Sequence, residues 1–354
     1  MSLALPILNE SPQRPTFARG PRSLSSVKLL RISLTDRCNL RCVYCMPDDG
    51  VTFYDREDVL SADDIVAVAA AARDAGVTHF KLTGGEPTLR KDLVDIVRRL
   101  KALDPLDLSM TTNGLRLGQQ RGRLAHELHD AGLDRLTVSL DSLDAETFSR
   151  ISGRRGFTLD QLWAGLDAAA AAGLGRLKLN FVVIGGVNDH EAPDFAALTV
   201  DRPWTVRFIE YMPLGDSALT RSLVGADTHT VDNEQIIAGI EDVHGPLVPI
   251  DRDGEPGVGP AQVYRLTRPG ARGKVGFISA MSQPFCETCN RLRLTARGEL
   301  RACLFDGGEV DLLPTLRASP EPRRELIALM ARCVAEKPET HSARGNRAMS
   351  QLGG

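Results

Sequence analysis

The sequence has no uninterrupted run of eighteen apolar residues and no excess of charge of either sign. Its 354 residues carry a formal net charge of −3, and 25% of them are charged. A helix that crosses a membrane needs roughly 20 consecutive apolar residues, and proteins that coat nucleic acid carry basic stretches or patches. We therefore expect a globular protein with a large core that neither spans a membrane nor binds nucleic acid.

The first group of cysteines has no histidine near it in the sequence. Three of the seven cysteines, Cys38, Cys42 and Cys45, fall within eight residues at C-x₃-C-x₂-C spacing, and no His lies within thirty residues of them. A structural zinc site normally closes with four Cys or His ligands. An odd number of cysteines also disfavours a disulfide framework. Three thiolates on one loop suit a cubic 4Fe–4S cluster with one iron left open.

Residues 1–26 lack the apolar segment of a secretory signal. They are rich in Pro, Ser and Arg and contain Glu10 as their only acid. We expect a flexible tail, with a transit peptide as the alternative. Because six of the cysteines form two groups suited to metal binding in a reducing compartment, we expect a cytoplasmic protein.

From Leu29 onward, apolar runs alternate with helix-like stretches. Expected strands cover 29–34, 77–82, 106–110, 136–140, 177–184 and 206–209. Expected helices run from a capping box at 61–64 to Gly76, and then over 91–103, 120–131, 159–172 and 193–200. Six βα repeats predict an α/β fold, a partial (β/α)₆ TIM-like barrel, with a doubly wound sheet as the alternative. Polar, glycine-rich segments follow the strands, where barrel sites assemble.

After Pro213 the regular alternation fades. Residues 251–260 read as a loop, and 263–266 and 275–278 as strands. We expect three regions: a tail (1–26), the barrel (27–245), and a smaller C-terminal iron–sulfur module without a core of its own that closes the barrel's open side (246–354).

A second cysteine group lies in this C-terminal region. Cys286, Cys289 and Cys303 again offer three ligands, and the second C-x₂-C pair of a zinc ribbon is absent. Cys333 falls on the apolar face of an expected helix, where a lone cysteine usually packs. We therefore predict a second three-cysteine 4Fe–4S cluster.

Several cations occupy unusual positions in the expected strands. Arg31, Lys81 and Lys178 lie on the first, second and fifth strands, and Arg207 on the sixth. A buried charge without a partner is costly, so cations from separate strands favour an anionic ligand. Near the second cysteine group, Arg291 and Arg293 alternate and can face the same way on an extended segment; a solvated edge strand is the alternative.

The cysteine spacing of the first group resembles that of the radical S-adenosylmethionine (SAM) enzymes. A closer resemblance, to the family of GTP 3′,8-cyclases that open molybdenum cofactor biosynthesis, runs from about Val27 to the C-terminus. It rests on Leu30-Arg31-Ile32-Ser33-Leu34-Thr35-Asp36-Arg37-Cys38-Asn39, Thr83-Gly84-Gly85-Glu86-Pro87, Cys286-Glu287-Thr288-Cys289-Asn290-Arg291-Leu292-Arg293 and the terminal Gly353-Gly354.

The resemblance implies roles for individual residues. It implies that Cys38, Cys42 and Cys45 hold a cluster that cleaves SAM. It also implies a second cluster, held by Cys286, Cys289 and Cys303, whose open iron binds guanine. It implies SAM contacts from Tyr44, Gly84, Gly85, Glu86, Ser139 and Met212. It implies GTP contacts from Arg31, Lys81, Thr111, Lys178, Arg291 and Arg293. The two arginines 291 and 293 then count as catalytic with the first cysteines, and the Gly-Gly tail reaches into the active site.

The resemblance also implies a reaction and partners. GTP is converted to (8S)-3′,8-cyclo-7,8-dihydroguanosine 5′-triphosphate after a 5′-deoxyadenosyl radical removes the ribose 3′ hydrogen. The implied partners are a reductive electron donor such as flavodoxin or ferredoxin, and cyclic pyranopterin monophosphate synthase as the next enzyme; the chain is a monomer or homodimer. The alternatives are another radical SAM enzyme with an auxiliary cluster, such as a peptide-modifying maturase, or a zinc-stabilised binding protein.

Metal content tests these alternatives directly. Anaerobically reconstituted protein is expected to hold about eight irons and as many sulfides per chain, because each cubic cluster contains four of each. Iron and acid-labile sulfide assays with elemental analysis measure this. Four irons would remove the second cluster, and colourless protein that contains zinc would contradict both clusters.

Overall fold

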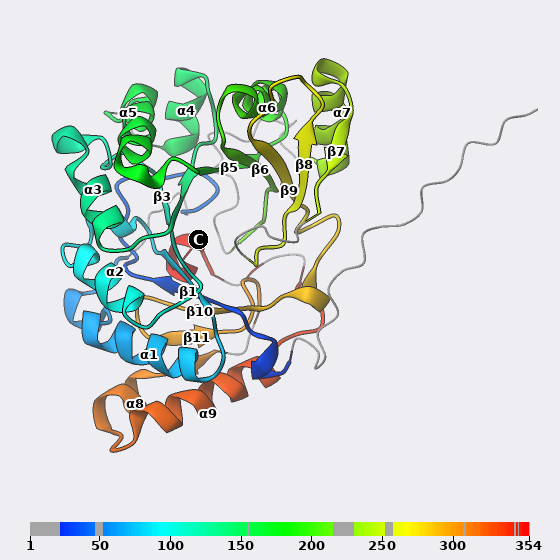
Figure 1. The fold of residues 1–354 in the computed structure, drawn as a ribbon. Helices are drawn as coiled ribbons and strands as arrows, with labels where there is room; N and C mark the ends of the chain where they lie inside the picture. The colour runs from blue at the N-terminus through cyan, green and yellow to red at the C-terminus, as the bar shows by residue number, and fades with distance from the viewer. Residues whose placement is uncertain are drawn as a thin grey trace, which may run out of the picture.

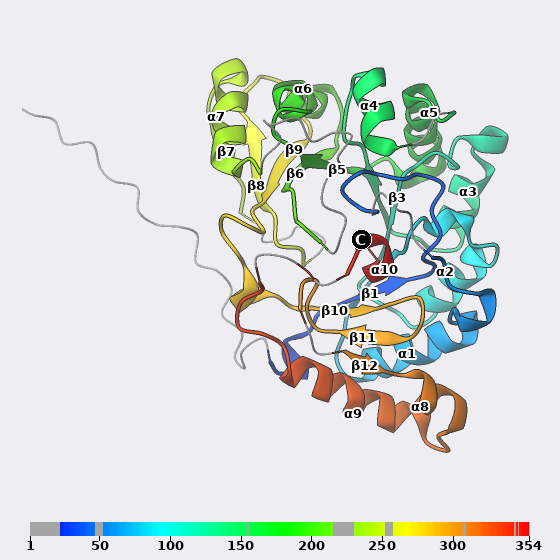
Figure 2. The same cartoon turned by 180° about the vertical axis from the view of Figure 1, so that it is seen from behind.

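A computed structural model describes residues 22–46, 52–153, 156–214, 230–251, 258–306, 309–342, 345 and 347–353. In these residues a twelve-stranded sheet curves around a central space, and helices cover its outer side (Figures 1 and 2). The strand order is β12-β11-β10-β1-β2-β3-β4-β5-β6-β9-β8-β7. None of the helices described combines the length and apolarity that a membrane crossing requires.

The first six strands are all parallel to their neighbours and follow one another in chain order. They are β1 (Leu29–Ser33), β2 (His79–Thr83), β3 (Asp107–Thr112), β4 (Arg135–Ser139), β5 (Lys178–Val183) and β6 (Thr205–Glu210). The helices between them are α1 (Ala62–Asp74), α2 (Leu93–Lys101), α3 (Arg123–Asp130), α4 (Ala145–Ser152), α5 (Leu159–Ala169) and α6 (Ala192–Asp201). Because these helices cover the outer side of the sheet, the partial barrel is confirmed and the doubly wound alternative is wrong. The sequence analysis did not anticipate α4.

The C-terminal region adds strands to both edges of this sheet. On one edge β9 (Lys274–Ile278) pairs parallel with β6, and β8 (Gln262–Leu266) and β7 (Leu247–Pro249) follow antiparallel. On the other edge β10 (Arg291–Leu294) pairs parallel with β1, and β11 (Glu299–Arg301) and β12 (Val310–Asp311) follow antiparallel. The remaining helices are α7 (Asn233–His244), α8 (Leu313–Ala318), α9 (Pro322–Ala335) and α10 (Met349–Leu352).

The core lies between the sheet and its helices, not inside the barrel. Side chains of a strand alternate between its two faces. On β1, Leu30 and Ile32 are fully buried in the main hydrophobic cluster, whereas Arg31 lines the central space. The same cluster includes Leu292 of β10 and Met330 of α9, so the C-terminal region shares the barrel's core. The boundary at 245/246 stays a prediction.

Helix α1 shows how the local sequence sets an element. The Ser61 hydroxyl accepts from the Asp64 backbone N–H at 3.2 Å, and the Asp64 carboxylate accepts from the Ser61 N–H at 2.9 Å. This is the predicted capping box, which satisfies two backbone donors at the helix start. Ile65 and Val68 then face the core, and Gly76, at φ 91°, lies just past the C-cap residue Ala75.

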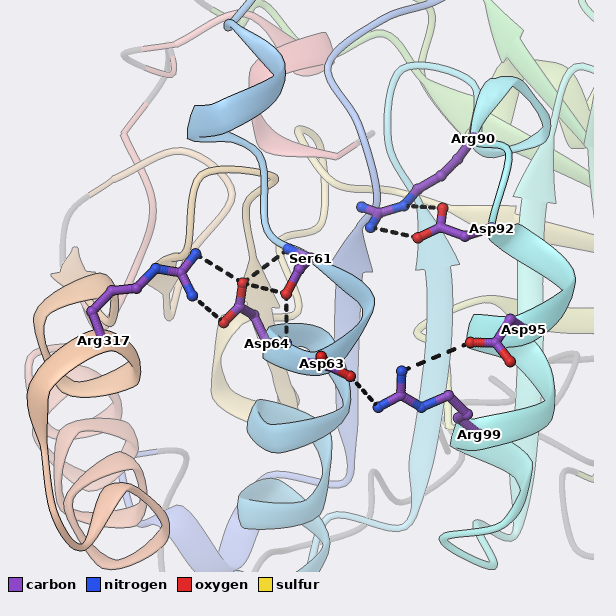
Figure 3. Close-up of polar contacts among 8 residues, drawn as sticks. All are labelled: Ser61, Asp63, Asp64, Arg90, Asp92, Asp95, Arg99 and Arg317. Carbon is purple, nitrogen blue, oxygen red and sulfur yellow. Dashed lines mark hydrogen bonds and ion pairs between the residues drawn. The ribbon is translucent and has the colours of Figure 1, made fainter.

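Asp64 also links α1 to the C-terminal region (Figure 3). The Arg317 guanidinium of α8 donates to both carboxylate oxygens of Asp64, one of them at 2.9 Å. Burial raises the pKa of Asp64, but the hydrogen bonds from Arg317 and Ser61 outweigh it and hold the pKa below the usual value. The neighbouring Asp63 instead forms a surface ion pair, at 2.7 Å, with Arg99 of α2. Arg99 also pairs with Asp95 of its own helix.

Replacing Asp64 by Ala is expected to lower the free energy of unfolding by about 1–2 kcal/mol at neutral pH, because the carboxylate half of the capping box and its pair with Arg317 are lost. The depressed pKa means that this contribution is present above the pKa of the unfolded carboxyl and disappears as the pH falls through the folded value, below about pH 4. Denaturant unfolding at pH 7 and pH 3 measures it.

The matched control is Asp63→Ala, one residue earlier in the same helix. Its side chain is 86% exposed, so its ion pair with Arg99 is expected to contribute little, under about 1 kcal/mol. Equal losses in the two variants at pH 7 would contradict the assigned role of Asp64.

Candidate active site

A cavity of about 310 Å³ lies inside the curved sheet. Residues from the parallel strands, from the loops at their carboxyl ends and from the C-terminal region line it. All of the predicted site residues are among them: Arg31, Cys38, Cys42, Tyr44, Cys45, Lys81, Gly84, Gly85, Glu86, Thr111, Ser139, Lys178, Met212, Cys286, Cys289, Arg291, Arg293 and Cys303. Arg207 lines the same cavity. The structure therefore brings together both cysteine groups and the expected cations.

The first cysteine group lies on the loop that follows β1. The Cys45 N–H donates to the Cys42 carbonyl at 2.9 Å, which forms a tight turn. The loop is fastened to the end of α4, where the N–H groups of Arg41 and Val43 donate to the carbonyls of Ser152 and Ile151. Thus α4, which the sequence analysis missed, supports the cysteine loop.

Burial dominates the electrostatics of this loop. It raises the pKa of Cys38 to about 11, with Glu86 adding to the effect, and the pKa of Cys45 to about 12, with Cys38 and then Asp141 adding to it. It also raises the pKa of Cys42 well above the usual value, again with a contribution from Asp141. Iron ligation as thiolates therefore requires these thiols to release their protons.

The donor set fits an iron–sulfur cluster. Among the described residues, no three Cys, His, Asp or Glu side chains lie close enough together to bind a single metal ion. In a cubic cluster each thiolate binds a different iron, so three thiols along one cavity wall suffice. The three side by side on this loop meet that requirement.

The two glycines after β2 allow a close approach of backbones. Gly85 N–H donates to the Thr35 carbonyl at 2.6 Å, and Glu86 N–H to the Arg37 carbonyl at 2.7 Å. A Cβ added at Gly85 would lie 2.3 Å from the Arg37 carbonyl oxygen. Because they have no Cβ, the glycines allow this turn to pack directly against the backbone of the segment that leads into the cysteine loop.

Glu86 is buried and already hydrogen-bonded by the protein. Its carboxylate accepts from the Thr88 N–H at 3.0 Å, the Thr88 and Thr112 hydroxyls at 2.7 Å, and the Asn113 N–H at 2.7 Å. A carboxylate offers about four acceptor positions, so most of its capacity is used. The Asn113 amide in turn donates to the Asn39 side chain at 2.8 Å. Glu86 therefore positions the cysteine loop, and its predicted SAM contact stays a prediction.

Asp141 is a site residue that sequence reasoning did not single out. The Tyr44 hydroxyl donates to one oxygen of its carboxylate at 2.7 Å, and the Val182 N–H to the other at 2.9 Å. Burial raises the pKa of Asp141 to about 6. The signal that could have identified it is its position: a carboxylate directly after a buried strand, at the carboxyl edge of the sheet.

The cavity wall carries buried cations that lack carboxylate partners. Burial, followed by repulsion from neighbouring arginines, lowers the pKa of Lys81 well below the usual value and that of Arg293 to about 9. Lys81 and Arg207 both donate to the Thr137 hydroxyl, at 3.0 and 3.4 Å. Within the described residues, no Asp or Glu forms an ion pair with Lys81, Arg207 or Arg293. Such uncompensated charge indicates an anionic ligand.

The strand register lines up part of this charge. Arg31 on β1 lies opposite Arg293 on β10 and opposite Lys81 on β2. We call these three residues the cation row. Like charges on directly opposed residues destabilise a sheet, so this row favours an anionic group beside it. The sequence alone did not reveal that these residues are neighbours.

In the second cysteine group, Cys289 has the opposite electrostatics, whereas burial raises the pKa of Cys286. Burial raises the pKa of Cys289, but Arg291 and Lys337 outweigh it and lower that pKa to about 6. Cys289 is therefore favoured as a thiolate without any metal. Cys333 packs in the core against β11 with its thiol 3.5 Å from the Leu300 carbonyl, as the sequence predicts.

The last described helix, α10, lies in the middle of the curved sheet (Figures 1 and 2). After α10, the Gly353 carbonyl accepts from the Thr83 hydroxyl at 3.2 Å and from Arg31 at 3.4 Å. The chain end thus contacts the cation row. Gly354 lies outside the described residues.

Comparison with known proteins agrees with this site. The radical SAM superfamily model matches residues 32–199, and the "Molybdenum Cofactor Synthesis C" model matches residues 204–343. Two similar relatives are the GTP 3′,8-cyclases of Pelotomaculum thermopropionicum, 44% identical, and of Moorella thermoacetica, 45% identical. Each alignment spans 333 residues, 93% of this chain and 98% of the relative.

A solved structure supports the fold. Streptococcus suis SuiB bound to S-adenosylmethionine aligns with a TM-score of 0.56 at 15% identity, over 84% of this chain and 67% of that one. Fold and cysteine loop together define a radical SAM enzyme, a class that implies SAM and a 4Fe–4S cluster. Within that class, the chain belongs to the GTP 3′,8-cyclase family. The maturase and the zinc-stabilised protein are thereby set aside.

Replacing Glu86 by Ala is expected to reduce the free energy of unfolding of the apoprotein by at least about 2 kcal/mol, because two buried backbone N–H groups lose their acceptors. Glu86→Gln, which keeps one acceptor oxygen, is expected to lose less. Anaerobic urea unfolding measures both, with the exposed Glu57→Ala as the control. An Ala variant as stable as the control would contradict the positioning role.

Proposed function

We propose that this chain converts GTP to (8S)-3′,8-cyclo-7,8-dihydroguanosine 5′-triphosphate, the step that opens molybdenum cofactor biosynthesis. One observation carries the proposal: two separate three-cysteine groups and the cation row line the same cavity. The cavity thus offers two cluster sites and a polyanion site together. The identity of 44–45% to GTP 3′,8-cyclases over nearly their whole length supports the same function.

Cys38, Cys42 and Cys45 would hold the SAM-binding cluster. The bound cluster would supply the electron for reductive cleavage of SAM, the chemistry by which the ribose 3′ hydrogen of GTP would be removed. The chain's own part is to orient SAM. Tyr44 is fixed by its hydrogen bond to Asp141, and the backbone of Gly84 and Gly85 lines the cavity next to the loop. Ser139 and Met212 complete the proposed SAM contacts.

The cation row binds the triphosphate in this proposal. Three cations on adjacent strands match a ligand with several negative charges, and arginine offers planar pairs of donors for phosphate oxygens. Thr111 on β3, the strand next to β2, and Lys178 on β5 add contacts further along the sheet, and Arg207 on β6 joins them. The Thr111 hydroxyl is buried and has no hydrogen-bond partner among the described residues, which leaves it able to serve a ligand.

Cys286, Cys289 and Cys303 would hold a second 4Fe–4S cluster, with an open iron for the guanine base. Support comes from the donor set, from the lowered pKa of Cys289 and from its place on the same cavity. Arg291 stands next to this group with its guanidinium 4.8 Å from the centre of the Phe285 ring. Arg291 therefore links the second cysteine group to Arg293 of the cation row, which lies two residues further along β10.

The chain end closes the site in this proposal. Gly353 holds Arg31 through its carbonyl, so the tail fixes a cation that contacts substrate. A filled cavity excludes water, which protects radical intermediates from side reactions. The reaction also needs a one-electron donor such as flavodoxin or ferredoxin, and cyclic pyranopterin monophosphate synthase is the proposed next enzyme.

The double variant Arg291→Ala/Arg293→Ala is expected to lose cyclised product by at least about 100-fold, because two hydrogen-bonded charges to GTP are removed. Formation of 5′-deoxyadenosine without product is expected to persist, since the SAM site is untouched. Anaerobic turnover with SAM, GTP and dithionite, followed by mass spectrometry, measures both compounds.

The control is Arg297→Ala, on the turn that follows β10. This exposed guanidinium lies 4.9 Å from the centre of the Tyr54 ring and does not line the cavity. It is expected to turn over as the parent does. Parent-level product from the double variant would refute the GTP assignment of the two arginines.

A further inference from the structure

Lys337 is a buried lysine beside the second cysteine group. It lies two residues past the end of α9 and is 4% exposed. Its ammonium donates a hydrogen bond to the backbone carbonyl of Cys289. Helix α9 packs against α1 on the outer side of the sheet (Figure 2), so a helix remote from the cavity delivers this cation to the cluster loop.

The ammonium of Lys337 has no carboxylate partner among the described residues. The adjacent Glu336 pairs with Arg332 at 3.5 Å, one turn back along α9. Burying an ammonium without a counter-ion costs several kcal/mol. Lys337 also differs from the cation row, because it is not among the residues found to line the cavity. Its anionic neighbour is therefore the cysteine group and not GTP.

We propose that Lys337 is a positioning residue that raises the reduction potential of the second cluster through its charge and its hydrogen bond at Cys289. The potential of an iron–sulfur cluster depends on nearby charge and on hydrogen bonds around its ligands. In a poorly solvated site, a fixed positive charge stabilises the electron that the cluster accepts. This inference rests on the second cluster of the proposed function.

The charges near the first cysteine group differ in sign from the charge of Lys337 near the second. There the nearby buried charges include the carboxylates of Glu86 and Asp141, which disfavour an added electron. The chain thus makes the two clusters unequal, and the second is the easier to reduce. With three thiolate ligands the second cluster is an anion, so Lys337 also offsets its repulsion of the triphosphate.

Redox titration of the reconstituted full-length chain, followed by electron paramagnetic resonance, tests the inference. Perturbation by SAM assigns the first cluster's signal, and perturbation by GTP the second's. Lys337→Met removes charge and hydrogen bond, Lys337→Gln keeps a donor without the charge, and Lys337→Arg keeps both. Arg332→Met is the matched control, because Arg332 lies near the end of α9 and its side chain is 63% exposed.

The second cluster's potential is expected to become more negative in Lys337→Met and Lys337→Gln and to stay near the parent's in Lys337→Arg and Arg332→Met. The first cluster's potential is expected to be unchanged in all four. An unchanged second potential in Lys337→Met, or equal shifts of both clusters, would overturn the role of Lys337. So would a Met variant that loses the second cluster while the Gln variant keeps both the cluster and the parent's potential.

Iron content separates this failure from failure of the proposed function. Eight irons in the parent, with an unchanged potential in the variants, would refute only Lys337. Four irons in the parent would refute the second cluster and this inference with it.

Discussion

Positive charge buried on the concave face of the sheet is the constraint on which the site depends. In a closed eight-stranded barrel the interior is filled by packed apolar side chains. Here the alternation along each strand is used differently: apolar residues such as Leu30 and Phe80 face the helices, and Arg31 and Lys81 face inward. Opening the barrel leaves a cavity where these cations can meet a large anion.

This arrangement explains why both edges of the sheet come from the C-terminal region. Strand β10 completes the cation row with Arg293, and the loop before it carries Cys286 and Cys289. On the opposite edge β9 continues the parallel sheet beside Arg207 on β6. The same segments therefore build the wall of the barrel and supply its second cysteine group. Fold and site cannot be separated here.

Much of the fold was predictable because the βα repeats are regular and their caps are local. The capping box at Ser61 and Asp64 is an example, since both partners lie within one turn. Helix α4 was missed although its ends carry local signals, the N-cap Asp144 and Gly153. Its support of the cysteine loop could not be predicted, because that contact joins distant residues such as Val43 and Ile151. The sequence identified the cations and cysteines by type and position. It could not show that Arg31 opposes both Lys81 and Arg293, because register depends on tertiary pairing.

The pairing of β1 with β10 also has a consequence for synthesis. The first strand of the barrel keeps one open edge until residues near 294 have left the ribosome, because its second neighbour lies more than 250 positions downstream. An exposed strand edge invites association with other chains. The nascent protein therefore carries its first cysteine loop on an incomplete sheet for most of its translation. The strand that completes the barrel wall and the second cysteine group are therefore synthesised at the same stage.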